Sequence, residues 1–187
     1  MTMSPVTELA EARTAYLAAV SPFYDETLAA VIEAVASSGS IGKADIGALL
    51  FWKRLRADTP WVTTLHALPD AQVRDVTARA VSQARDVTLS LPEAALQARS
   101  TLAVLPGFRS GDPMASALLV AAAPERMAVY DRRAGHGLQI LGIDVPLRHG
   151  HYGRYMAVVE HLTKQMNAAG HAWNPRTVDT ALFWLGR

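Results

Sequence analysis

Apolar side chains recur through most of the chain at intervals of three and four residues, the spacing of a helix with one buried face. The first clear case joins Leu28, Val31 and Val35, and the polar run Ser37–Ser40 predicts the end of that helix. The same spacing predicts further helices over about 44–55, from 70 onward and over 152–166. Two short runs, 87–91 and 127–130, are the only ones that suggest extended chain.

Helix start signals add to this pattern. Ser90 and Glu93 have the spacing of a capping box, which predicts a helix reaching Leu105. Asp112-Pro113 and Asn174-Pro175 each place a capping residue before a proline in the first turn. No internal repeat or linker interrupts the chain, so we expect an all-α fold over residues 1–187. We expect one compact domain, with two helical lobes that meet at a cleft.

Composition and charge narrow the class of protein. Half of the 187 residues are hydrophobic and cysteine is absent, which excludes disulfides and thiolate zinc sites. The net charge is +1, but residues 1–50 carry −4 and residues 51–187 carry +5, which permits contact of the second part with phosphates. No apolar run is long enough for a bilayer span and no signal-peptide pattern is visible. We therefore expect a cytoplasmic protein without a membrane partner.

A glycine-punctuated connection between two predicted helices carries the strongest functional signal. Gly107 and Gly111 are placed for two tight turns, Arg109 lies between them, and the small-residue helix after Asp112 follows. Backbone amides at such turns, together with a helix N-terminus, form a site for a phosphate. A tight connection between helices without any ligand is the alternative.

The whole segment resembles the DNA-binding and catalytic segment of the helix-hairpin-helix DNA glycosylases. The resemblance covers about residues 94–140 and rests on Leu105-Pro106-Gly107, Gly111, Ala115 and Tyr130-Asp131. Flanking residues 45–54 and 153–156 resemble proteins described as 8-oxoguanine-glycosylase-like. The resemblance implies that Asp131 is the catalytic aspartate, which stabilises the positive sugar and positions water while a damaged base leaves. The alternative is that Asp131 is an ion-pair partner of Arg126, Arg132 or Arg133, or a helix N-cap.

Some positions depart from the family pattern. Bifunctional members carry a lysine where this chain has Pro113, so the resemblance implies a monofunctional enzyme without lyase chemistry by that route. Asp112, as an N-cap, would take the amides that a phosphate needs and would repel the phosphate. The hairpin is also longer between its glycines than usual, and Arg133 replaces a family histidine. These departures weaken DNA binding at the hairpin or shift it to Arg109.

Other motifs lead to weaker hypotheses. His149 and His151 have the spacing of two metal ligands, but no third ligand is placed by the sequence, so we expect no metal and no cofactor. Phe108, at the predicted hairpin tip, is the aromatic residue expected to contact DNA, whereas Trp52 and Trp184 are expected to pack in the core. Serine-hydrolase and nucleotide-binding glycine motifs are absent.

The sequence thus predicts a DNA-interacting protein that resembles a monofunctional DNA N-glycosylase, with double-stranded DNA as its partner. The residues expected to hold DNA are Gly107, Phe108, Arg109, Gly111, Arg132, Arg133 and Arg154. Two alternatives stay open: a DNA-binding module that lacks turnover, and a protein-interaction domain whose basic part meets an acidic partner. The recognised base and the oligomeric state are not predicted.

Overall fold

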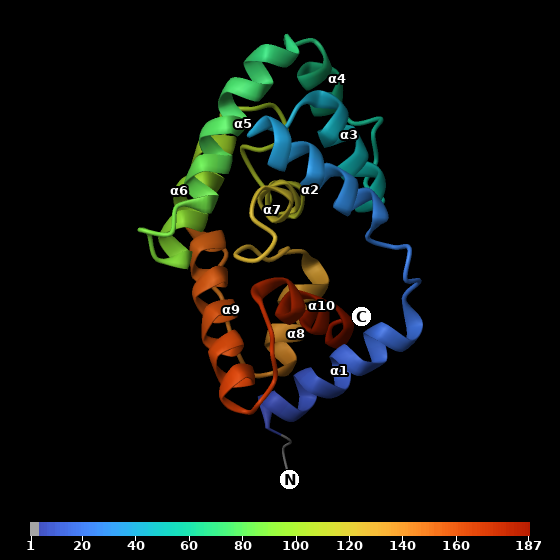
Figure 1. Ribbon diagram of the computed structural model, residues 1–187, viewed down its shortest axis with the longest axis vertical. Coiled ribbons are helices and arrows are strands. Elements are labelled where there is room, and N and C mark those ends of the chain that lie inside the picture. Colours follow the sequence, from blue (N-terminus) through green and yellow to red (C-terminus); the bar gives the residue numbers. More distant parts are fainter. Residues whose placement is uncertain (1–3) are drawn as a thin grey trace.

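The computed structural model describes residues 4–187 and is all-helical, as predicted (Figure 1). The helices of this range are α1 (Pro5–Ala19), α2 (Glu26–Ser38), α3 (Lys43–Trp52), α4 (Pro60–His66), α5 (Asp70–Arg85), α6 (Leu91–Leu102), α7 (Pro113–Ala122), α8 (Arg132–Ile140), α9 (His151–Ala168) and α10 (Pro175–Leu185). None of these helices is both long and apolar enough to cross a membrane.

The helices form two groups that share one core. Figure 1 shows α2 to α7 in the upper part, and α1 together with α8, α9 and α10 in the lower part. The first helix therefore packs with the last one, and Arg13 donates a hydrogen bond to the Thr180 hydroxyl across that contact at 2.8 Å. The long helices α6 and α9 pack against each other and join the two groups along one side.

Helix α7 lies in the middle of the molecule, and all of its residues from Met114 to Ala122 are buried. Most of these side chains are small, which lets α2, α3, α5 and α6 approach it closely. The segment that leaves α7 runs through buried Met127, Ala128 and Val129 and delivers Asp131 to the start of α8. A rigid central helix thus fixes the position of the candidate catalytic residue.

Local signals placed several helix starts correctly. The Glu93 carboxylate accepts a hydrogen bond from the Ser90 backbone amide, and the Asn174 side chain accepts one from the Thr177 amide. The predicted extended runs 87–91 and 127–130 form no strand, and 91 onward is already helical. A basic segment with two glycines, such as residues 132–137, is typical of a loop, but these residues form the first part of α8. The glycines allow close approach rather than a turn: Gly137 lies against the Leu182 carbonyl of α10, and Gly135 lies against the Tyr130 hydroxyl.

Candidate functional site

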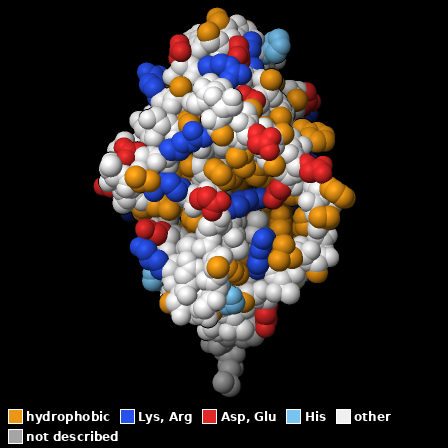
Figure 2. All heavy atoms as spheres, viewed as in Figure 1, with side chains coloured by type: hydrophobic (Ala, Val, Ile, Leu, Met, Phe, Trp, Pro, Cys, Tyr) orange, Lys and Arg blue, Asp and Glu red, His pale blue; other side chains and the backbone are white. Residues whose placement is uncertain are grey.

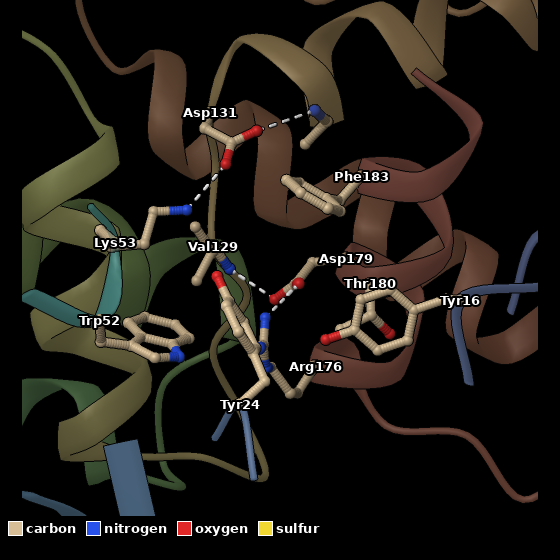
Figure 3. Close-up of a pocket in the computed structure, with 11 residues that line it drawn as sticks. Tyr16, Tyr24, Trp52, Lys53, Val129, Asp131, Arg176, Asp179, Thr180 and Phe183 are labelled. Atoms are coloured by element: carbon tan, nitrogen blue, oxygen red, sulfur yellow. Dashed lines mark hydrogen bonds and ion pairs between the residues drawn. The ribbon is translucent and has the colours of Figure 1, made fainter. Parts of the chain in front are cut away.

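Asp131 is the N-cap of α8 and is held by three hydrogen bonds. Its Oδ1 accepts from the backbone amides of Arg133 and Ala134 at 3.0 and 3.1 Å, and its Oδ2 accepts from Lys53 Nζ at 2.7 Å (Figure 3). The N-cap alternative is therefore confirmed for this residue. Its ion-pair partner is Lys53, and none of the three arginines considered from the sequence pairs with it.

The backbone that carries Asp131 is fixed on both sides. The Val129 amide donates to the Asp179 carboxylate at 2.7 Å, and the Tyr130 amide donates to the Ser116 hydroxyl at 3.0 Å. On the carbonyl side, the buried Tyr155 hydroxyl donates to Val129 O at 2.8 Å. Side chains from α7, α9 and α10 thus set the direction in which Asp131 points.

Lys53 was not found by sequence reasoning. It follows α3 directly, and its side chain is only 11% exposed, next to the Trp52 ring at 5.6 Å. Arg54, the residue after it, adopts a left-handed backbone with φ of 52°, which is rare for a residue with a side chain. The only signal in the sequence was the resemblance of residues 45–54 to glycosylase-like proteins, and that resemblance assigned no chemistry to the lysine.

Electrostatics keep the Asp131 side chain ionised. Burial alone would raise its pKa, but the Lys53 ammonium and the two backbone amides outweigh burial, so the pKa of Asp131 is lowered from its ordinary value. A second carboxyl of the pocket behaves in the opposite way: burial raises the pKa of Asp179 to about 6, against the attraction of Arg176. Asp131 is therefore the stronger candidate for a permanent negative charge at neutral pH.

The pocket beside Asp131 is narrow and aromatic. Its free volume is about 20 Å³, about the space of one water molecule. It is lined by Tyr16, Tyr24, Trp52, Lys53, Val129, Asp131, Ala134, Arg176, Asp179, Thr180 and Phe183, which Figure 3 shows converging from both helix groups. A larger hollow of about 770 Å³, between the end of α1, α2 and the end of α3, shares Tyr16, Tyr24, Trp52 and Phe183 with it.

The narrow pocket and the larger hollow adjoin each other, because four aromatic residues line both. The larger hollow has room for a nucleobase, and exposed Phe23 and Phe51 stand at its lining. Trp52 is buried, as expected for a core residue, but it also lines both spaces.

In the hairpin between α6 and α7, both glycines have the positive φ that tight turns require. Gly107 and Gly111 have φ of 86° and 82°, and a Cβ at Gly107 would overlap the Trp61 ring. Arg99 of α6 ties the connection together, because it donates to the carbonyls of Phe108 and Gly111 at 2.7 and 3.0 Å. Arg99 is a second residue of the site region that the sequence analysis missed.

Phe108 does not project from this connection. Its side chain is fully buried and packs edge-on against Trp61, with ring centroids 5.9 Å apart. The prediction that Phe108 contacts DNA is therefore wrong for its side chain. The Phe108 side chain turns inward because the core beneath the connection accommodates its ring beside Trp61.

Asp112 also differs from its predicted role. It directly precedes α7, but its side chain caps none of the helix amides. Its two oxygens instead accept from Arg99 Nε at 2.8 Å and pair with His151 Nδ1 at 2.7 Å. The expectation that Asp112 takes up the α7 amides is wrong, because Arg99 and His151 occupy both oxygens of its carboxylate.

A basic groove lies on the other side of the α8 N-terminus. We use this name for the hollow of about 940 Å³ whose lining includes the arginines Arg99, Arg109, Arg132 and Arg148, the histidines His136, His149 and His151, and Asp112. Exposed Arg109 and Arg132 face it from the hairpin and from α8. Because Tyr130 lines the groove and Asp131 lines the aromatic pocket, adjacent residues connect the two features.

The remaining predicted DNA contacts are arranged differently. Arg133 is exposed, but its guanidinium lies over the Phe183 ring at 4.9 Å, on the side of the aromatic pocket. Arg154 donates to the carbonyls of Pro146, Arg148 and His149, so it shapes the loop before α9. Because these three carbonyls accept from its guanidinium, Arg154 supports the wall of the basic groove and does not project into it.

The face seen in Figure 2 carries no patch of one charge. Hydrophobic, basic and acidic side chains alternate across it. Among residues 4–187, no three histidine, aspartate or glutamate side chains come together as a metal site, and His151 is turned to Asp112.

No family model, curated protein or solved structure matches the chain.

Proposed function

We propose that the protein binds double-stranded DNA and acts as a monofunctional N-glycosylase, with Asp131 as the catalytic carboxylate. The observation that carries the proposal is the position of an ionised carboxylate in an aromatic pocket beside a basic groove. A carboxylate of this kind stabilises a sugar with oxocarbenium character and orients the attacking water.

The DNA backbone would follow the basic groove. Gly111 of the hairpin lines it with a left-handed backbone, and Arg109 and Arg132 add positive charge. Since Asp112 leaves the α7 amides free of its side chain, the obstacle expected from the sequence is smaller. One nucleotide would leave the stack, with its base on the aromatic side chains and C1′ toward Asp131.

Base release from a duplex panel tests this function. The panel contains 8-oxoguanine, uracil, an alkylated purine or adenine mispaired with guanine, and released base is measured by chromatography. Asp131→Asn keeps the shape and capping ability of the side chain but removes the charge, so we expect a loss of about 10²- to 10⁴-fold in rate. Asp86→Asn is the matched control, because Asp86 also accepts a backbone amide, that of Thr88, at a turn away from the pocket.

The result decides between the proposal and its alternatives. Excision that is equal in the wild type and Asp131→Asn contradicts the role of the carboxylate, and absence of excision on every lesion contradicts the enzymatic function. A DNA-binding module without turnover is the second candidate, because Lys53 occupies Asp131 Oδ2 and the pocket holds only about 20 Å³. That candidate predicts salt-sensitive duplex binding without base release.

A further inference from the structure

The first turn of α9 leaves three backbone amides unpaired. Gly150 precedes the helix with a left-handed backbone, φ of 76°, and has no side chain that could cap it. Within residues 4–187, the backbone amides of His151, Tyr152 and Gly153 donate no hydrogen bond. The turn reads His-Tyr-Gly-Arg and so contains no carboxylate. The start of this 18-residue helix is therefore an uncapped positive end.

The loop before α9 turns its carbonyls away from these amides. The Arg154 guanidinium donates to the carbonyls of Pro146, Arg148 and His149 at 2.9, 2.7 and 2.7 Å. Gly150, His151 and Tyr152 all line the basic groove. The unpaired amides thus lie at the wall of the groove, where an acceptor from outside the chain can approach them.

His151 adds a second unpartnered group at the same place. Its side chain is 8% exposed and lines the groove, and its Nε2 is buried without a hydrogen-bond partner among the described residues. Its Nδ1 pairs with Asp112 at 2.7 Å, and its ring stands edge-on to Tyr130, with centroids 4.4 Å apart. Helix side chains tilt toward the N-terminus, which places this fixed ring on the side of the unpaired amides. A ligand oxygen would satisfy Nε2 and the amides together.

The charges around His151 suit an oxyanion. Burial would raise the pKa of Asp112, but hydrogen bonds from His151 and Arg99 outweigh burial and lower it, so the carboxylate is ionised. Nδ1 is therefore the donor of the pair, and Nε2 is the nitrogen left for a ligand. Arg99 Nε offsets the Asp112 charge at 2.8 Å, and exposed Arg148 lines the same groove.

We propose that the first turn of α9 and His151 form a phosphate site, in which phosphate oxygens accept from the unpaired amides and from Nε2 of the protonated imidazole. The inference rests on the proposed function for the source of the phosphate, which is the DNA backbone. The site differs from the hairpin turn, because α9 belongs to the lower group of helices in Figure 1. A strand held at Arg109 of the hairpin and at α9 is anchored to both groups.

Nuclear magnetic resonance with inorganic phosphate tests the site itself. The full chain, labelled with ¹⁵N, is titrated with sodium phosphate near neutral pH at constant ionic strength, and sodium chloride is the reference. We expect saturable shifts of the amides of residues 151–153 and of the His151 Nε2 signal with phosphate alone. Absence of these shifts, or equal shifts with chloride, overturns the proposal, whichever variant folds.

Matched variants test the part of His151. His151→Asn keeps a donor near the position of Nδ1, toward Asp112, and lacks Nε2, whereas His151→Gln places an amide near the position of Nε2. Phosphate affinity should fall about 10-fold in His151→Asn and less in His151→Gln, because a charge-assisted hydrogen bond is lost. His161→Asn is the control, since His161 is exposed on the same helix outside the groove. Equal affinities of the wild type and a folded His151→Asn protein, checked by circular dichroism, overturn the proposal.

An undamaged duplex identifies the source of the phosphate without any base release. Fluorescence anisotropy should show duplex binding about 10-fold weaker in His151→Asn and unchanged in His161→Asn. Duplex binding that falls in Arg109→Ala but not in His151→Asn overturns the inference and leaves DNA binding in place. Phosphate shifts at α9 in a protein that binds no duplex overturn the assignment to DNA together with the proposed function.

Discussion

The ion pair between Lys53 and Asp131 allows a stability prediction with an internal control. Two lysines of the chain pair with a carboxylate at nearly the same distance, 2.7 Å for Lys53 with Asp131 and 2.9 Å for Lys164 with Glu160. The pairs differ in exposure: the side chains of the first are 11% and 17% exposed, and those of the second 72% and 33%. Replacement by methionine removes the charge at both positions with little change of length or helix propensity.

Loss of Lys53 should cost far more than loss of Lys164. Removal of one member of a fully buried pair costs about 3–5 kcal/mol, because the other charge stays buried without a partner. Asp131 keeps two backbone amides and some contact with solvent, so we expect about 2 kcal/mol for Lys53→Met. For Lys164→Met we expect about 0.3–0.5 kcal/mol, the value of an exposed helix pair.

Urea unfolding at pH 7 measures both costs, and a pH series checks their cause. The pKa of Asp131 is lowered in the folded protein from its ordinary 3.8, so its stabilising contribution is complete above that value and is lost as the pH falls through the folded-state pKa. The difference between the wild type and Lys53→Met should therefore shrink below about pH 4. Equal costs for the two lysine variants, or a difference that does not change with pH, would refute the assignment.

Three further predictions concern packing in the core and DNA binding at the basic groove. Thr77→Val should destabilise the protein by about 2 kcal/mol, and Thr77→Ser by less, because the Thr77 hydroxyl serves both the buried amide and the carbonyl of Ile41; thermal unfolding compares them. Gly137→Ala should cost about 1–3 kcal/mol or more, since the new Cβ would overlap the Leu182 carbonyl, and an unchanged midpoint would contradict this close packing of α8 on α10. Arg109→Ala should weaken duplex binding and lower the slope of log Kd against log salt concentration by about one, because one phosphate contact is lost. Fluorescence anisotropy at several salt concentrations measures this slope.

Interactions within a few residues of each other could be predicted from the sequence. The start of α6 follows from Ser90 and Glu93, and the start of α10 follows from Asn174 and its proline, because each capping contact spans only three residues. The apolar spacing likewise placed α2, α5 and α9, whose buried faces repeat regularly. Helices α1, α4 and α8 were not predicted, since their buried positions are few and partly small.

Tertiary packing alone decided the composition of the site. Lys53 and Asp131 are 78 residues apart in the chain, and no local pattern relates them. The inward turn of Phe108 depends on Trp61, and the pairing of Asp112 with His151 depends on how α9 lies against α6 and the hairpin. Sequence periodicity reports which face of a helix is buried, but the partner of a buried charge is chosen by the packing of distant helices. For this reason the chain itself indicated Asp131 as a candidate, and only the folded structure supplied the amine beside it.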